Sequence, residues 1–152
     1  MALDLLAIAA AVAARFAGVT PPSGQTLAGA THLLPNNIPN TPYVIVTPPS
    51  GELGMPEGFP TARIRDTHDF DVYVLLSKAS GDQPVDLART YAWWPVIRGA
   101  LAGQMKLGIS TVMKAVVTED YDFDVYAYAG TEYHAWHFIA RVWTEDTMAM
   151  TI

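Results

Sequence analysis

The residues of this chain best suited to metal chemistry are two histidines three positions apart, His134 and His137, with Glu132 shortly before them. Imidazole and carboxylate groups are common zinc ligands. The surrounding residues alternate in hydrophobicity, which predicts a strand, and side chains three positions apart on a strand point to opposite faces. We therefore expect structural histidines, and keep as an alternative a small metal-dependent enzyme that uses Glu132, His134 and His137.

Three alternating aspartates, Asp120, Asp122 and Asp124, resemble the opening of a calcium-binding loop. Such a loop needs glycine at its sixth position and glutamate at its twelfth, where this chain has Val125 and Thr131. The pattern therefore predicts a solvated acidic strand edge. The sequence also has no cysteine and no phosphate-binding, dinucleotide-binding or serine-hydrolase motif. We expect no catalytic site, no metal and no cofactor.

The composition limits the classes of partner. Charged residues make up 16% of the 152 residues, against roughly 25% in ordinary soluble domains, while 51% are apolar. A net charge of −6 argues against DNA or an anionic membrane as the main ligand, because phosphates are bound by clustered Lys and Arg. Surface charge is therefore scarce, so either the monomer has a thin polar shell or a sizeable part of its exterior is covered in the working state.

The apolar opening stretch, Met1 to Val19, is interrupted by Asp4 and Arg15, and it has no cationic start. It therefore matches neither a signal peptide nor a membrane-spanning helix. Apolar residues at spacings of three and four instead predict an amphipathic helix over about 2–17, ended by Gly18.

The remaining pattern predicts one α+β domain over 1–152, with an antiparallel (mixed) sheet of about five strands and two main helices on one face. The expected order is α-β-β-α-β-β-β. Long loops rich in Pro and Gly are expected over about 18–42 and 48–60. The strands are expected at 43–47, 70–76, 111–117, 123–129 and 136–143. The second helix is expected from about Asp82 to Ala102, with a kink after Tyr91 caused by Pro95.

A five-residue stretch, Asp69–Tyr73, recurs as Asp122–Tyr126, which indicates similar strand chemistry. In each copy one row of side chains is apolar, and the other begins with aspartates and becomes aromatic. The second face of the sheet is therefore unusually apolar for a face in contact with water. We predict that another subunit covers it, through the interface candidates Tyr73, Leu75, Tyr126, Tyr128, Ile139 and Trp143.

Several features together resemble the tail terminator of tailed phages, the small protein that closes the head-facing end of a long tail tube. They are the order of elements, the apolar opening helix Leu3 to Ala17, the Trp93-Trp94 helix followed by Met105-Lys106-Leu107-Gly108, and the aromatic closing strand Tyr133 to Trp143. The resemblance covers most of the chain as a pattern of elements. Other head–tail connector and tail-completion subunits are near alternatives.

The resemblance implies a structural virion protein that is made in the host cytoplasm and is not an enzyme. It implies a homo-oligomeric, hexameric ring that stacks on the tail-tube protein and presents its other side to the head-completion protein. Genomic DNA would pass through the ring without specific binding, and no membrane is involved. An acidic lumen would repel DNA, and its candidates are Asp69, Asp71, Asp120, Asp122 and Asp124.

A third hypothesis is a small-ligand module with an aromatic pocket built from Trp93, Trp94, Tyr126 and Trp136. Aromatic side chains bury large areas and are more often core residues than ligand contacts. We rank this hypothesis below the other two.

Overall fold

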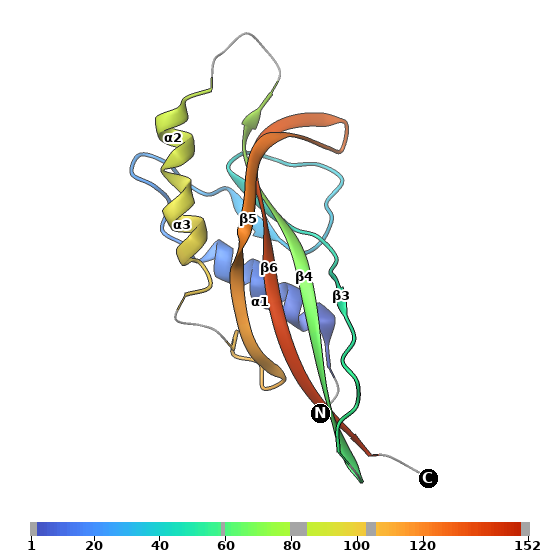
Figure 1. The fold of residues 1–152 in the computed structure, drawn as a ribbon. Helices are drawn as coiled ribbons and strands as arrows, with labels where there is room; N and C mark the ends of the chain where they lie inside the picture. The colour runs from blue at the N-terminus through green and yellow to red at the C-terminus, as the bar shows by residue number, and fades with distance from the viewer. Residues whose placement is uncertain (1–2, 59, 80–84, 103–105, 150–152) are drawn as a thin grey trace.

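The structure is a computed structural model that describes residues 3–58, 60–79, 85–102 and 106–149. The elements follow one another as α1, four strands, two short helices and two long strands (Figure 1). Their bounds are α1 (Leu5–Ala17), β1 (Gly29–Thr31), β2 (Tyr43–Val46), β3 (Ser50–Glu52), β4 (Thr61–Lys78), α2 (Leu87–Tyr91), α3 (Trp93–Gly99), β5 (Val112–Tyr128) and β6 (Thr131–Ala149).

The strands form one six-stranded sheet in the order β1-β2-β4-β6-β5, and β3 pairs with β4 beside this path. Among the described strands, β1 and β2 pair in parallel, and all the other pairs are antiparallel. The predicted α+β class and mostly antiparallel sheet are therefore confirmed. The predicted number of about five strands and the predicted order were wrong, because four strands precede α2 and two follow α3 in the described residues.

Two errors explain the wrong order. The segments that form β1 and β3 have three residues each and lie within the predicted loops 18–42 and 48–60, so they are too short to show a period. The predicted strands 111–117 and 123–129 are in fact one strand, β5. Its register against β6 shifts between Val117 and Tyr121, so the alternation is interrupted there although the strand continues.

The opening helix α1 forms where the sequence predicts it. The Asp4 side chain caps its start by accepting a hydrogen bond from the Ala7 amide at 3.1 Å, and Gly18 caps its end. Its buried face is formed by Ile8, Val12, Ala13 and Phe16.

The second predicted helix is divided at Ala92 into α2 and α3. Pro95 has no N–H to donate to the Tyr91 carbonyl, so the break lies where the proline predicts it. The described helix begins later than predicted, with Asp86 as its N-cap. The predicted start at Asp82 lies outside the described residues.

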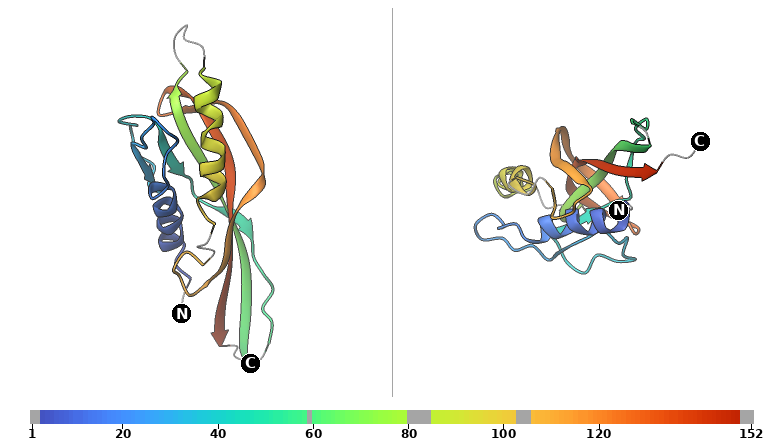
Figure 2. Two further views of the ribbon diagram at one scale, coloured as in Figure 1. Left: turned by 90° about the vertical axis from the view of Figure 1, so that its left-hand side faces the viewer. Right: turned by 90° about the horizontal axis from the view of Figure 1, so that it is seen from below.

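The main core lies between one face of the sheet and the helices α1 and α3 (Figure 2). Both main helices therefore pack on one face, as predicted. The fully buried aromatic residues Phe16, Phe70, Trp93 and Phe138 provide much of its volume. A smaller cluster lies on the opposite face, which we call the second face, and contains Ile38, Ile45, Leu75, Tyr133 and Ala135.

A two-residue turn, Ala129-Gly130, joins β5 to β6, with Tyr128 paired to Thr131. Both turn residues have positive φ, 49° and 80°, as a type I′ turn requires. Alanine is strained in this region, whereas asparagine adopts it readily. We expect Ala129→Asn to raise the free energy of unfolding by about 0.5–1 kcal/mol, as measured by urea unfolding.

The control is the same substitution at Ala127, an exposed position within β5. Asparagine is a poor strand former, so Ala127→Asn should not stabilise the protein. Equal effects at the two positions would contradict the turn argument.

Candidate functional site

The two copies of the repeated five-residue stretch lie on either side of the same strand. Asp69–Tyr73 belongs to β4 and Asp122–Tyr126 to β5, and both strands pair antiparallel with β6. The two copies therefore run parallel to each other across β6. Their aspartates and tyrosines gather on the second face, around residues that β6 contributes.

His137 of β6 connects the two copies. Its Nε2 lies 2.7 Å from Oδ1 of Asp71, and its Nδ1 lies 3.2 Å from Oδ1 of Asp122. An imidazole can donate from both ring nitrogens only when both carry a proton. The Tyr73 ring stacks on the imidazole with a centroid distance of 4.7 Å and an interplanar angle of 17°. One side chain thus links all three strands.

Two tyrosines complete this network. The Tyr126 hydroxyl lies 2.8 Å and 2.7 Å from the two carboxylate oxygens of Asp122 and donates to this group. Burial raises the pKa of Tyr126, and the hydrogen bond and charge of Asp122 raise it further. Burial also raises the pKa of Tyr73, with added effects of Asp71 and Asp122. Both phenols therefore remain protonated at neutral pH and serve as donors or ring contacts.

Arg141 forms a second ion pair on this face, with Asp69. Its Nε and Nη2 lie 2.7 Å and 3.0 Å from the two oxygens of that carboxylate. The hydrogen bond and charge of Asp69 raise the pKa of Arg141, and Glu52 and Asp120 contribute smaller effects. Such forked pairs fix geometry as well as charge.

The structure therefore brings the predicted acidic residues together around β6. Asp69, Asp71 and Asp122 have partners there, and Asp120 acts on Arg141. Asp124, opposite Ala135, is exposed and accepts a hydrogen bond from the Val125 amide. Sequence alternation could place Arg141 on this face, but its pairing with Asp69 required the strand order.

The apolar part of the second face is covered differently from the prediction. Leu75 is 1% exposed within the small cluster that contains Ile38, and the Tyr128 hydroxyl donates to the Pro35 carbonyl. The chain's own loop between β1 and β2 thus covers this end, where we had predicted another subunit. Tyr73 and Tyr126 also pack against this cluster.

The other two interface candidates lie farther along β6. Ile139 and Trp143 are half-buried. The Lys114 ammonium lies 5.1 Å from the Trp143 ring centroid, and the Arg141 guanidinium lies 5.9 Å from it. A contact of these two residues with a second subunit stays a prediction.

The predicted metal ligands are not brought together. His134 stacks on Phe123, which packs against the main core, whereas His137 lies on the second face. Within residues 3–58, 60–79, 85–102 and 106–149, no group of three or more His, Asp or Glu side chains could hold a metal ion.

The aromatic pocket of the third hypothesis is also divided. Trp94 stacks on Tyr121 and lies 5.4 Å from Trp136 between ring centroids. Trp93 is buried and donates from Nε1 to Oε1 of Gln25 at 2.8 Å, whereas Tyr126 lies on the second face. The four residues therefore do not line one pocket.

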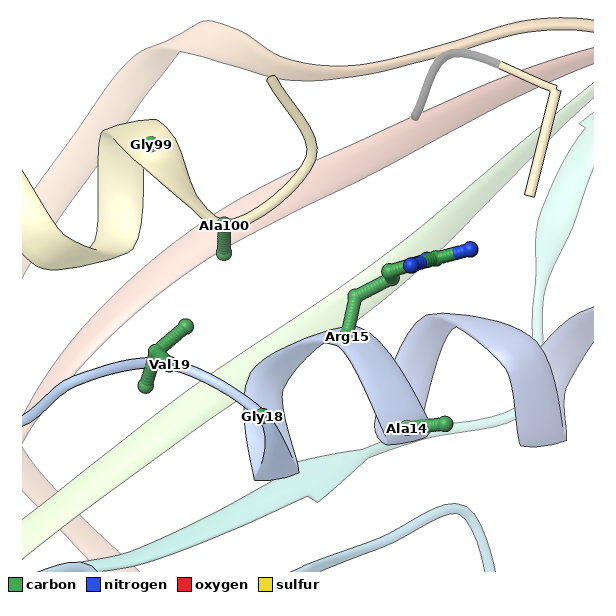
Figure 3. Close-up of a pocket in the computed structure, with 6 residues that line it drawn as sticks. All are labelled: Ala14, Arg15, Gly18, Val19, Gly99 and Ala100. Atoms are coloured by element: carbon green, nitrogen blue, oxygen red, sulfur yellow. The ribbon is translucent and has the colours of Figure 1, made fainter. Parts of the chain in front are cut away.

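A pocket of about 220 Å³ lies between the C-terminal ends of α1 and α3 (Figure 3). Its lining residues are Ala14, Arg15, Gly18, Val19, Gly99 and Ala100. The end of α1 at Gly18 was visible in the sequence, but the second helix was expected to continue to about Ala102, whereas α3 ends at Gly99, and nothing indicated that the two helix ends would meet. We call this the α1–α3 pocket.

Comparison with known proteins adds no assignment to these features. No family model matches the chain, and no curated protein matches its sequence. None of the helices described is both long enough and apolar enough to cross a membrane.

The network around His137 makes a testable contribution to stability. His137→Asn leaves Asp71 and Asp122 without the side chain that connects them. Because all three groups are partly exposed, we expect a loss of about 1 kcal/mol in the free energy of unfolding, measured by urea unfolding. Asp124→Asn removes an exposed carboxylate outside this bridge and should change stability much less. Equal losses would show that the bridge has no special role.

A different histidine, His68, should make stability depend on pH. It is buried beside Thr144, with Nε2 3.0 Å from the hydroxyl, and burial lowers its pKa below the ordinary value of 6.5, against opposing effects of Asp66 and Asp69. The unfolded chain therefore takes up this proton first as pH falls. The contribution of neutral His68 is present above pH 6.5 and is lost as pH falls toward the lower folded-state pKa.

The measurement is urea unfolding of the wild type and of His68→Gln between pH 8 and pH 5. The wild type should lose more stability across this range than the variant, with an excess slope of at most about 1.4 kcal/mol per pH unit, the value for one proton. Parallel pH profiles would contradict the prediction.

Proposed function

We propose that this protein is a structural subunit of a ring, and that the ring is the tail terminator at the head-facing end of a phage tail tube. The observation that carries this proposal is the exposure of large apolar side chains. Three pairs of them lie at the start of α1, in the loop after β1 and after β3: Leu5 and Leu6, Leu33 and Leu34, and Leu53 and Met55. Paired apolar residues of this kind are typical of contact surfaces.

Three properties support the terminator role within this class. The chain resembles tail terminators in its opening helix, its Trp93-Trp94 helix and its aromatic closing strand. The aspartates around β6 suit an acidic lumen through which DNA passes without binding. The low content of charged residues, 16%, suits a protein whose surface is largely covered by partners.

The expected partners follow from this position. Copies of the chain form the ring, which is expected to be hexameric. One side of the ring binds the tail-tube protein and the other binds the head-completion protein, so the protein is located in the virion. The alternative is another head–tail connector or tail-completion subunit. Such a subunit would also form a ring, but the ring would bind different neighbouring proteins.

Light scattering of the purified protein over a range of concentrations tests the ring. We expect a discrete oligomer, with ring-shaped particles in negative-stain electron micrographs. Co-sedimentation with tubes of the major tail protein from the same genome tests the position. A protein that stays monomeric at high concentration and does not sediment with the tubes would contradict the proposal. A ring that forms but does not sediment with the tubes would favour the connector alternative.

A further inference from the structure

The loop between β1 and β2 is held over the second face by few contacts. We call its residues 34–41 the strap. Ile38, which is 6% exposed, is the only buried residue of the strap, and it belongs to the smaller cluster on the second face. Among the described residues, one hydrogen bond joins the strap to the sheet, from the Tyr128 hydroxyl to the Pro35 carbonyl. One apolar side chain and one hydrogen bond therefore hold the strap in place.

The backbone of the strap adds little to these two contacts. The Thr41 amide donates to the side chain of its neighbour Asn40, which is a contact within the strap itself. Pro35 and Pro39 have no N–H group to donate. Ordering a backbone has a cost in conformational entropy for every residue, so a segment with few contacts opens more readily than the fold as a whole.

The surface beneath the strap does not depend on the strap for its structure. Ile45, Leu75 and Ala135 of the smaller cluster lie on β2, β4 and β6, and Leu75 is paired with Tyr43 on one side and with Ala135 on the other. The two ends of the strap are also fixed, because β1 and β2 pair with each other. The strap can therefore move away while the sheet below it stays folded.

We propose that the strap is a displaceable cover, which opens as a unit and uncovers the apolar cluster of the second face while the sheet stays folded. In its closed position the strap controls access to this surface, because exposed apolar clusters are typical contact sites. This opening goes beyond the proposed ring, because it is a property of a single copy.

The absence of cysteine allows the opening to be measured by thiol labelling. Ala135→Cys places a thiol in the cluster beneath the strap, and Ala140→Cys is the matched control in the main core, since both alanines are 0% exposed on β6. In native buffer the first variant should react with Ellman's reagent at least about tenfold faster than the second. Its rate should also rise less steeply with urea, because local opening exposes less surface than global unfolding.

Two further substitutions, made together with Ala135→Cys, identify the strap as the cover. Ile38→Ser removes the buried side chain and should raise the labelling rate at least about tenfold. Tyr128→Phe removes only the hydroxyl and should raise the rate by a smaller factor. Asn37→Ser changes an exposed residue beside Ile38 and should leave the rate unchanged. The melting temperature of each variant separates local opening from a loss of overall stability.

Two results would overturn the proposal. One is that Ala135→Cys and Ala140→Cys react at equal rates and depend equally on urea. The other is that neither Ile38→Ser nor Tyr128→Phe raises the rate of Ala135→Cys. Both are measured at concentrations where a single copy is present, so they stand whether or not the ring forms. A wild type that is monomeric in solution and on tail tubes would contradict the ring alone.

Discussion

Replacing Phe138 with alanine is expected to lower the free energy of unfolding by about 3–5 kcal/mol, the usual cost of truncating a fully buried phenylalanine. Phe138 is 0% exposed and lies near the middle of β6, an inner strand of the sheet. Its ring lies 5.4 Å from that of Phe16 between centroids, so it joins the sheet to α1. The cavity would open between these two elements, and α1 cannot close it without leaving its own contacts. Urea unfolding followed by circular dichroism measures the loss.

Tyr91→Ala is the matched control, because it also truncates an aromatic residue but at a position 57% exposed. Its cost should be below about 1 kcal/mol, as for most surface changes. A loss of similar size in both variants would show that the α1–sheet core is less well packed than the contacts indicate.

The second large effect is expected for Gly54→Ala, although the change adds only one methyl group. The new Cβ would lie 1.9 Å from the Arg65 carbonyl oxygen, and no side-chain rotation relieves this clash, because the backbone fixes the position of Cβ. The segment must move away from β4 and lose the hydrogen bond from Gly54 to Asp66. We expect a loss of about 2–3 kcal/mol in the free energy of unfolding, from overpacking and the lost hydrogen bond.

Gly99→Ala provides the opposite control, again measured by urea unfolding. No atom lies within 4 Å of a Cβ at this position, the last of α3. Alanine favours a helix over glycine by up to about 1 kcal/mol, so this variant should be stabilised. Stability that is unchanged in Gly54→Ala would mean that the segment after β3 is not held against β4.

The elements with strong periodicity were predictable from the sequence. Alternation over 70–76 and 136–143 identified β4 and β6, and spacings of three and four identified α1. Pro95 marked the division between α2 and α3. In each case the local pattern reflects one buried face, so the sequence alone carries the signal.

The short strands could not be predicted in the same way. β1 and β3 have three residues each, and they form because β2 and β4 are present as partners. The continuity of β5 through Thr118 to Asp120 was also missed, because the alternation is interrupted where the register against β6 shifts. Pairing with β6 on both sides of this irregularity keeps the residues from Val112 to Tyr128 in one strand.

The candidate site was partly predictable. Alternation assigned the aspartates and aromatic residues to the second face, and the structure places them there. The alternation could not reveal that Asp71 and Asp122 meet at His137, because this contact depends on which strands are neighbours. The cover formed by Ile38 was missed as well, since a loop residue has no period that predicts burial.

The position of β6 also affects how the chain is made. β6 follows every other described strand in the chain, yet it lies between β4 and β5 and pairs with β4 from Thr61 opposite Ala149 to Lys78 opposite Tyr133. Sheets built on such distant pairings fold slowly, on the order of milliseconds to seconds. During translation, β4 and β5 therefore leave the ribosome before the strand that joins them exists. Until β6 emerges, the edges of β4 and β5 that it later covers stay unpaired, and unpaired strand edges are prone to aggregation.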